Sequence, residues 1–167
     1  MKKIQIFVFA IIMLFAFNQV KAQNTSSKAD VLSAYYGVKN ALISGDASAT
    51  NAKAKMLLAA ISSFPVDKLS AADKTTWTKY ADKLQFDARH ISESDDITHQ
   101  REHFASLSEN MFATVQAIKL NNAPVYRDYC PMKKSYWLSE TAAIQNPYYG
   151  NQMLTCGAVK ETLPAAK

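Results

Sequence analysis

Apolar residues recur at helical spacing through most of the chain after its first 28 residues. Hydrophobic side chains three or four positions apart are typical of amphipathic helices, and they predict four of them, over residues 29–44, 46–64, 71–92 and 97–120. Gly45 and Pro65 end the first two helices. Asp46 and Ser70 are expected N-caps of the second and third. Short turns between the helices favour an antiparallel four-helix bundle.

The pattern changes in the C-terminal segment, residues 122–167. Helical periodicity is lost there, prolines recur, and Tyr, Trp, Met and Cys become frequent. Because disordered segments contain few aromatic residues, we expect this aromatic- and sulfur-rich segment to be irregular but packed on the bundle. The expected fold is therefore all-α.

The N-terminus has the layout of a secretory signal peptide. Met1–Lys3 is basic, Ile4–Phe17 is almost entirely apolar, and Val20–Ala22 supplies the small residues of a cleavage site. Cleavage after Ala22 would leave Gln23 first, and the apolar run is too short to anchor the product in a membrane. We expect a periplasmic protein with one domain over residues 23–167, a usual domain size.

Charge and motifs limit the function classes. The net charge of +5 falls to about +2 once the lysines of the leader are removed, and no basic cluster remains for nucleic acid or an anionic membrane. The sequence has no phosphate-binding glycine loop, zinc-protease motif or serine-hydrolase elbow. We therefore expect a protein that is not an enzyme.

Sulfur residues in the C-terminal segment are the first candidate chemistry. Cys130, Met132, Met153 and Cys156 offer thiolate and thioether ligands, the set that prefers Cu(I). A disulfide between the two cysteines is the simpler interpretation from the residues alone, because exported thiols are usually oxidised. It would close a loop of about 27 residues and stabilise the fold by about 3 kcal/mol.

Three histidines are the second candidate. His99 and His103 are four residues apart, so a helix places both imidazoles on one face, a geometry found in metal sites and also on ordinary solvated faces. His90 would lie opposite His99 on a continuous helix. It can join them only if the helix breaks near residues 92–96.

Several runs of the sequence together carry a family resemblance: Arg89–Ser94, Asp96–Ile97, Gln100–Ser108, Val125–Tyr126, Tyr129–Met132, Trp137–Ser139, Asn146–Gly150 and Met153–Gly157. With these runs, the chain resembles an uncharacterised domain family of Gram-negative bacteria. That domain occurs alone after a signal peptide and also at the C-terminus of periplasmic adaptor subunits of copper/silver-type heavy-metal efflux systems.

The resemblance implies heavy-metal handling in the periplasm, most simply of copper. We therefore expect a protein that binds or delivers Cu(I), with a periplasmic efflux adaptor or another envelope protein as its partner. The expected ligands are the four sulfur residues, together with His99 and His103 and, given a helix break, His90. The alternative is a non-catalytic interaction module, stapled by a disulfide, that docks on such a partner through Trp137, Tyr148 and Tyr149.

Overall fold

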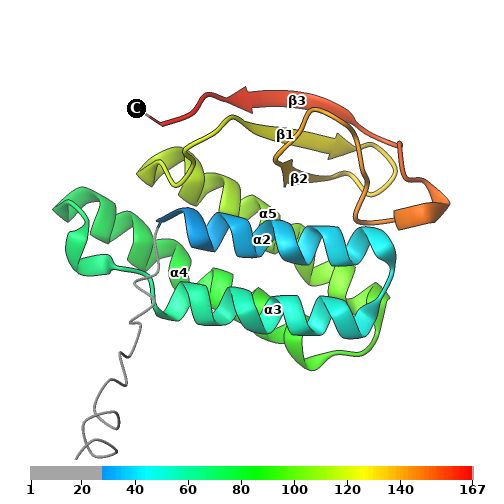
Figure 1. Cartoon of the computed structure of the whole chain (residues 1–167), viewed down its shortest axis with the longest axis horizontal. Helices are drawn as coiled ribbons and strands as arrows, with labels where there is room; N and C mark the ends of the chain where they lie inside the picture. Colours follow the sequence, from blue (N-terminus) through cyan, green and yellow to red (C-terminus); the bar gives the residue numbers. More distant parts are fainter. Residues whose placement is uncertain (1–27, 167) are drawn as a thin grey trace, which may run out of the picture.

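Figure 1 shows the computed structural model of the protein, which describes residues 28–166. The expected signal peptide, residues 1–22, and the expected new N-terminus at Gln23 lie outside the described residues. The described part of the chain forms four long helices followed by a three-stranded sheet. None of the helices in this part has the length and apolarity that crossing a membrane would require.

The four helices form an antiparallel bundle (Figure 1). Consecutive helices pack against each other, and each end lies within two residues of the range that apolar periodicity predicts. A short 3-10 turn, η1 (Val66–Lys68), precedes the third helix. The helices are α2 (Lys28–Ser44), α3 (Ala47–Ser62), α4 (Ala71–Glu93) and α5 (Ile97–Ile118).

Side-chain caps set where three of these helices begin. The Asp46 carboxylate accepts a hydrogen bond from the Ala49 N–H at 2.8 Å, and the Ser70 hydroxyl accepts one from the Asp73 N–H at 3.1 Å. Both caps were expected from the sequence and are confirmed. Asp96 caps α5 in the same way. Each cap satisfies an N–H group that has no partner inside the helix.

The C-terminal segment contains a regular sheet, and the prediction of an all-α fold is wrong. It contains the strands β1 (Val125–Cys130), β2 (Ser135–Ser139) and β3 (Ala158–Leu163), paired antiparallel in the order β2-β1-β3. The physical reason is that valine and the aromatic residues favour strands, and the strands are too short for periodicity to distinguish them from loop. The protein is mostly helical with a small antiparallel sheet.

The sheet packs across α2 and α5 (Figure 1). Tyr35 on α2 is fully buried at the junction, where its hydroxyl accepts a hydrogen bond from the Leu138 N–H of β2 at 3.0 Å. The same hydroxyl is 2.7 Å from the Ser108 hydroxyl on α5. One phenol therefore joins two helices and the sheet, and the aromatic residues of the tail complete the core of the bundle.

The turn before β3 is anchored to the other end of α2. Arg101 donates hydrogen bonds to the carbonyls of Leu42 at 3.1 Å and Pro147 at 3.0 Å. Gly150, in the 3-10 turn η2 (Gly150–Gln152), has a positive φ of 53°, and a Cβ there would lie 2.7 Å from a carbonyl oxygen of α2. Only glycine fits this close approach.

Asp128 is a buried carboxyl group in the central strand. Its side chain is inaccessible to solvent, and neither oxygen has a partner with good hydrogen-bond geometry. Burial raises the pKa of Asp128 from 3.8 to about 6, although nearby Ser139 and Lys39 partly favour the charged form. The protein therefore holds a buried negative charge under its sheet at neutral pH that its neighbours compensate only in part.

We expect Asp128→Asn to stabilise the protein at pH 7 by up to about 3 kcal/mol. The folded-state pKa lies above the unfolded value, so the wild type gains stability from the protonated form at low pH. The wild type loses this stability as the pH rises from about 4 to about 6. The stability of the variant, which has no carboxyl group at this position, should not fall in this way. Urea unfolding across this pH range measures the difference.

The matched control is Asp67→Asn, the same change at an exposed position of η1, which should leave the free energy of unfolding nearly unchanged. Equal stability of Asp128→Asn and wild type at pH 7, or a lower stability of the variant there, would show that the buried carboxylate is compensated.

Candidate metal centre

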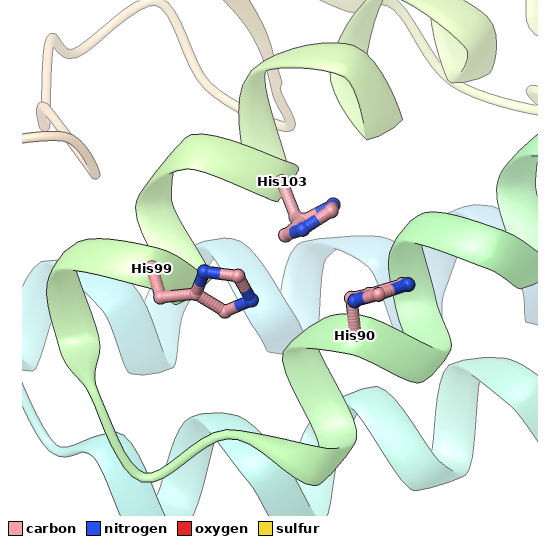
Figure 2. A group of neighbouring side chains, drawn as sticks. All are labelled: His90, His99 and His103. Carbon is pink, nitrogen blue, oxygen red and sulfur yellow. The ribbon is translucent and has the colours of Figure 1, made fainter.

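Three histidines meet where α4 turns into α5. His90 lies in the last turn of α4, and His99 and His103 lie on successive turns at the start of α5. Residues 94–96 break the helix, so α5 runs back along α4 and brings His90 to face the other two. The condition that the sequence set for His90 is therefore met. Figure 2 shows the three rings around a common space, with a ring nitrogen of His99 directed toward the other two.

The three imidazoles are close enough to share one ion. One nitrogen from each ring can be chosen so that all three lie within 4.8 Å of one another. The ring centroids of His90 and His103 are 4.4 Å apart, those of His99 and His103 are 4.7 Å apart, and those of His90 and His99 are 6.2 Å apart. All three side chains are half-buried. The cluster is thus near the surface but sheltered.

Asp87 orients one of these rings. Its carboxylate lies 3.1 Å from Nδ1 of His103, and its side chain is only 5% exposed. In a neutral imidazole, an Nδ1–H that donates to Asp87 leaves Nε2 unprotonated and free to bind an ion. Carboxylates commonly hold metal-binding histidines in this way. Sequence analysis missed Asp87, although its position three residues before His90 places it on the same face of α4.

An exposed aromatic ring borders the cluster. Phe86 is 56% exposed, and its ring centroid lies 4.4 Å from that of His90 and 5.9 Å from that of His103. Phe86 and Asp87 also line a shallow groove of about 380 Å³ between α4 and α5, together with Asp82, Lys83, Ser106 and Asn110. Two residues that line the groove, Phe86 and Asp87, are thus in contact with the histidine cluster.

The geometry fits an ion once at least one imidazole ring has turned. Metal–nitrogen bonds of about 2.0–2.1 Å put tetrahedral ligand atoms about 3.3 Å apart, which is within reach of the observed separation. The rings of His90 and His103 are stacked with planes only 14° apart, so one must turn, because an ion binds in the plane of each ring. Three nitrogen ligands would leave a fourth position open. The cluster could hold a metal ion.

Comparison with known families is decisive for the helical part of the chain. The family described as "Protein of unknown function (DUF3347)" matches residues 31–123, more than half of the sequence. The protein belongs to the DUF3347 family. This confirms the expected membership in an uncharacterised domain family. No curated protein and no solved structure is detectably similar to the chain.

The DUF3347 match contains the whole histidine cluster and Asp87, whereas the strands and all the candidate sulfur ligands follow it. Among the residues that the structure describes, the group of at least three potential metal-binding side chains consists of histidines and includes no cysteine. The histidine cluster and the sulfur residues, which sequence analysis had combined into one ligand set, are therefore two separate features of the structure.

The sulfur residues differ in accessibility. Cys130 is buried at the end of β1, and Cys156 is half-buried just before β3, with its thiol close enough to Cys130 to interact with it electrostatically. Met132 is 61% exposed in the turn after β1, and Met153 is 37% exposed after η2. The two thiols are thus neighbours, while both thioethers extend toward solvent.

The aromatic residues expected to anchor a partner are mostly core residues. Trp137 is fully buried and Tyr148 is 4% exposed, with its hydroxyl donating to the carbonyl of Tyr136. Tyr149 is half-buried. In this DUF3347 protein, Trp137 and Tyr148 therefore hold the sheet on the bundle and are not available to a partner.

Proposed function

We propose that this protein binds one copper ion through His90, His99 and His103 and acts as a periplasmic copper-binding or copper-delivering protein. The observation that carries the proposal is the convergence of three imidazole nitrogens within 4.8 Å of one another. The buried Asp87 carboxylate supports it, because a carboxylate partner fixes the orientation of a ligand and raises its basicity.

Copper is favoured by the chemistry of the ligands. Imidazole suits Zn²⁺, Cu²⁺, Fe²⁺ and Ni²⁺, and among divalent ions of the first transition row Cu²⁺ binds most tightly to a given nitrogen site. The sequence favoured Cu(I) because it combined thiolates with thioethers. The proposal moves the ion to the histidines, which makes Cu(II) the form to test first.

A binding or delivery role fits the position of the cluster. Its ligands are half-buried, and their neighbours Phe86 and Asp87 line a groove. Three protein ligands leave room for a fourth from a partner. The signal-like N-terminus and the sequence resemblance support export and a link to heavy-metal efflux. The partner in this proposal is a periplasmic efflux adaptor or another envelope protein, and no catalytic step is proposed.

The alternative function is a non-catalytic interaction module stapled by a disulfide. The neighbouring thiols of Cys130 and Cys156 are compatible with the staple. The burial of Trp137 and Tyr148 removes two of its three expected anchors, which leaves the half-buried Tyr149. The histidine cluster also has no role in that function.

The test is a metal titration against a competing chelator. We expect the protein to bind one equivalent of Cu(II), to bind Ni(II) and Zn(II) more weakly, and to show the spectroscopic features of nitrogen-coordinated Cu(II). Binding should weaken in acid, since protons compete for the imidazoles. A protein that fails to compete with the chelator for any of the three ions, or whose bound Cu(II) shows no nitrogen ligands, would refute the proposal.

A further inference from the structure

The two cysteines lie on neighbouring segments of the sheet. Tyr129 pairs with Ala158 in the antiparallel ladder between β1 and β3, so continuing that register puts Cys130 opposite Gly157, with Cys156 one residue further. The Cys156 thiol is close enough to the Cys130 thiol to interact with it electrostatically. Facing positions of adjacent antiparallel strands have Cα atoms about 4.5–5.5 Å apart, and a position one residue further along lies about 6 Å away. That distance is still within the Cα separation that a disulfide allows.

Gly157 and the surrounding contacts hold the chain in this arrangement. A Cβ at Gly157 would lie 2.7 Å from the Trp137 ring and 3.1 Å from the Tyr129 carbonyl oxygen, so only glycine lets this segment approach β1 so closely. The Asn146 amide donates a hydrogen bond to the Cys156 carbonyl at 2.6 Å. These contacts hold the backbone of Cys156 and Gly157 in place beside β1.

The two thiols differ in their access to a reagent. Cys130 is inaccessible to solvent, and its sulfur accepts a hydrogen bond from the Lys133 N–H at 3.4 Å. Cys156 is half-buried. Burial and the neighbouring Cys130 raise the pKa of Cys156, so it should react more slowly than an ordinary exposed cysteine. A soluble oxidant can nevertheless reach only Cys156 directly.

We propose that Cys130 and Cys156 form a reversible dithiol–disulfide pair in which Cys156 reacts first and Cys130 resolves. The oxidant is a disulfide-bearing molecule. The Cys156 thiolate attacks one sulfur of that disulfide, its S–S bond breaks, and one thiol leaves. The Cys130 thiolate then attacks the Cys156 sulfur of the mixed disulfide and releases the second thiol. The protein loses two protons and two electrons, and the oxidant is reduced to two thiols.

This pair is independent of the histidine site. Its product would join the end of β1 to the segment that leads into β3, an edge strand of the sheet. The proposal therefore gives the protein two forms, one with two free thiols and one with a disulfide across the sheet. Its test requires no metal.

The test treats the reduced protein with glutathione disulfide and follows it by intact-mass analysis. The wild type should become lighter by two hydrogen atoms and retain no glutathione. Cys130→Ser should accumulate one stable glutathione adduct at Cys156. Cys156→Ser should react at least about tenfold more slowly, because its remaining thiol is buried. In denaturant the two variants should react at similar rates, which separates accessibility from intrinsic reactivity.

Early quenching of the wild-type reaction, followed by peptide mapping, identifies the cysteine that reacts first without any substitution. The proposal can therefore be tested even if one of the variants does not fold. Mapping should place the first mixed disulfide on Cys156. The proposal is overturned if the wild type retains two glutathiones, if the first adduct forms on Cys130, or if the two variants react equally fast in the folded state.

Discussion

His99→Ala and His103→Ala should each lower the affinity for Cu(II) at least about a hundredfold, because each removes one of three ligands from a small ion. The double variant should reduce binding to the level of nonspecific surface sites. His90→Ala should have a similar effect, since its imidazole completes the cluster from α4. Competition titrations with each folded variant measure these changes.

Asp87→Asn tests the positioning role of the carboxylate separately from the ligands. We expect a smaller loss, about tenfold to a hundredfold, because all three imidazoles remain while the orientation of His103 is less well fixed. The nitrogen-coordinated spectrum should persist in this variant. Gln116→Ala, at an exposed position toward the other end of α5, is the control and should bind as wild type. Wild-type affinity in His99→Ala and His103→Ala would place the ion elsewhere.

Trp137→Ala should destabilise the fold by about 3–5 kcal/mol, the cost typical of truncating a buried tryptophan. Its side chain is fully buried, its indole N–H donates to the Ser139 hydroxyl at 3.2 Å, and it packs edge-on against Tyr148. The loss would leave a cavity between the sheet and the bundle. Urea unfolding followed by far-ultraviolet circular dichroism measures the change.

Met132→Ala is the matched comparison for this prediction. Met132 lies five residues before Trp137, in the turn that joins β1 to β2, and is 61% exposed, so its truncation should change the free energy of unfolding by less than about 0.5 kcal/mol. A Trp137→Ala protein as stable as wild type would mean that this tryptophan is not a core residue. It would restore Trp137 as a candidate anchor for a partner.

The helices could be predicted because each repeats its apolar spacing over four or more turns, and three of them begin at a side-chain cap. The sheet could not be predicted so readily, since its strands are five or six residues long and lie among prolines. One pattern did point to it. Valine and tyrosine in β1, a four-residue turn at Pro131–Lys134, and the sequence Ser-Tyr-Trp-Leu-Ser together describe a β-hairpin.

The candidate site was predictable only in part. The spacing of His99 and His103 follows from helix geometry, but the contribution of His90 depends on the direction in which α5 leaves the turn. In the sequence, Asp87 cannot be distinguished from an ordinary charged residue on a helix surface. Only the packing of α4 on α5 buries it beside His103. Tertiary contacts, and not local spacing, therefore select the ligand set.

All three ligands lie within one helical hairpin of the bundle, between His90 and His103. An ion bound there would cross-link segments that are already close in sequence, so little chain entropy would be lost in closing the loop between them. Its binding free energy would oppose local opening of this hairpin, because the opened form presents no preformed site. Binding of the ion would thus slow hydrogen exchange of the backbone amides at the junction of α4 and α5. Amides of the sheet, on the far side of α2 and α5, would exchange at the same rate as without the ion.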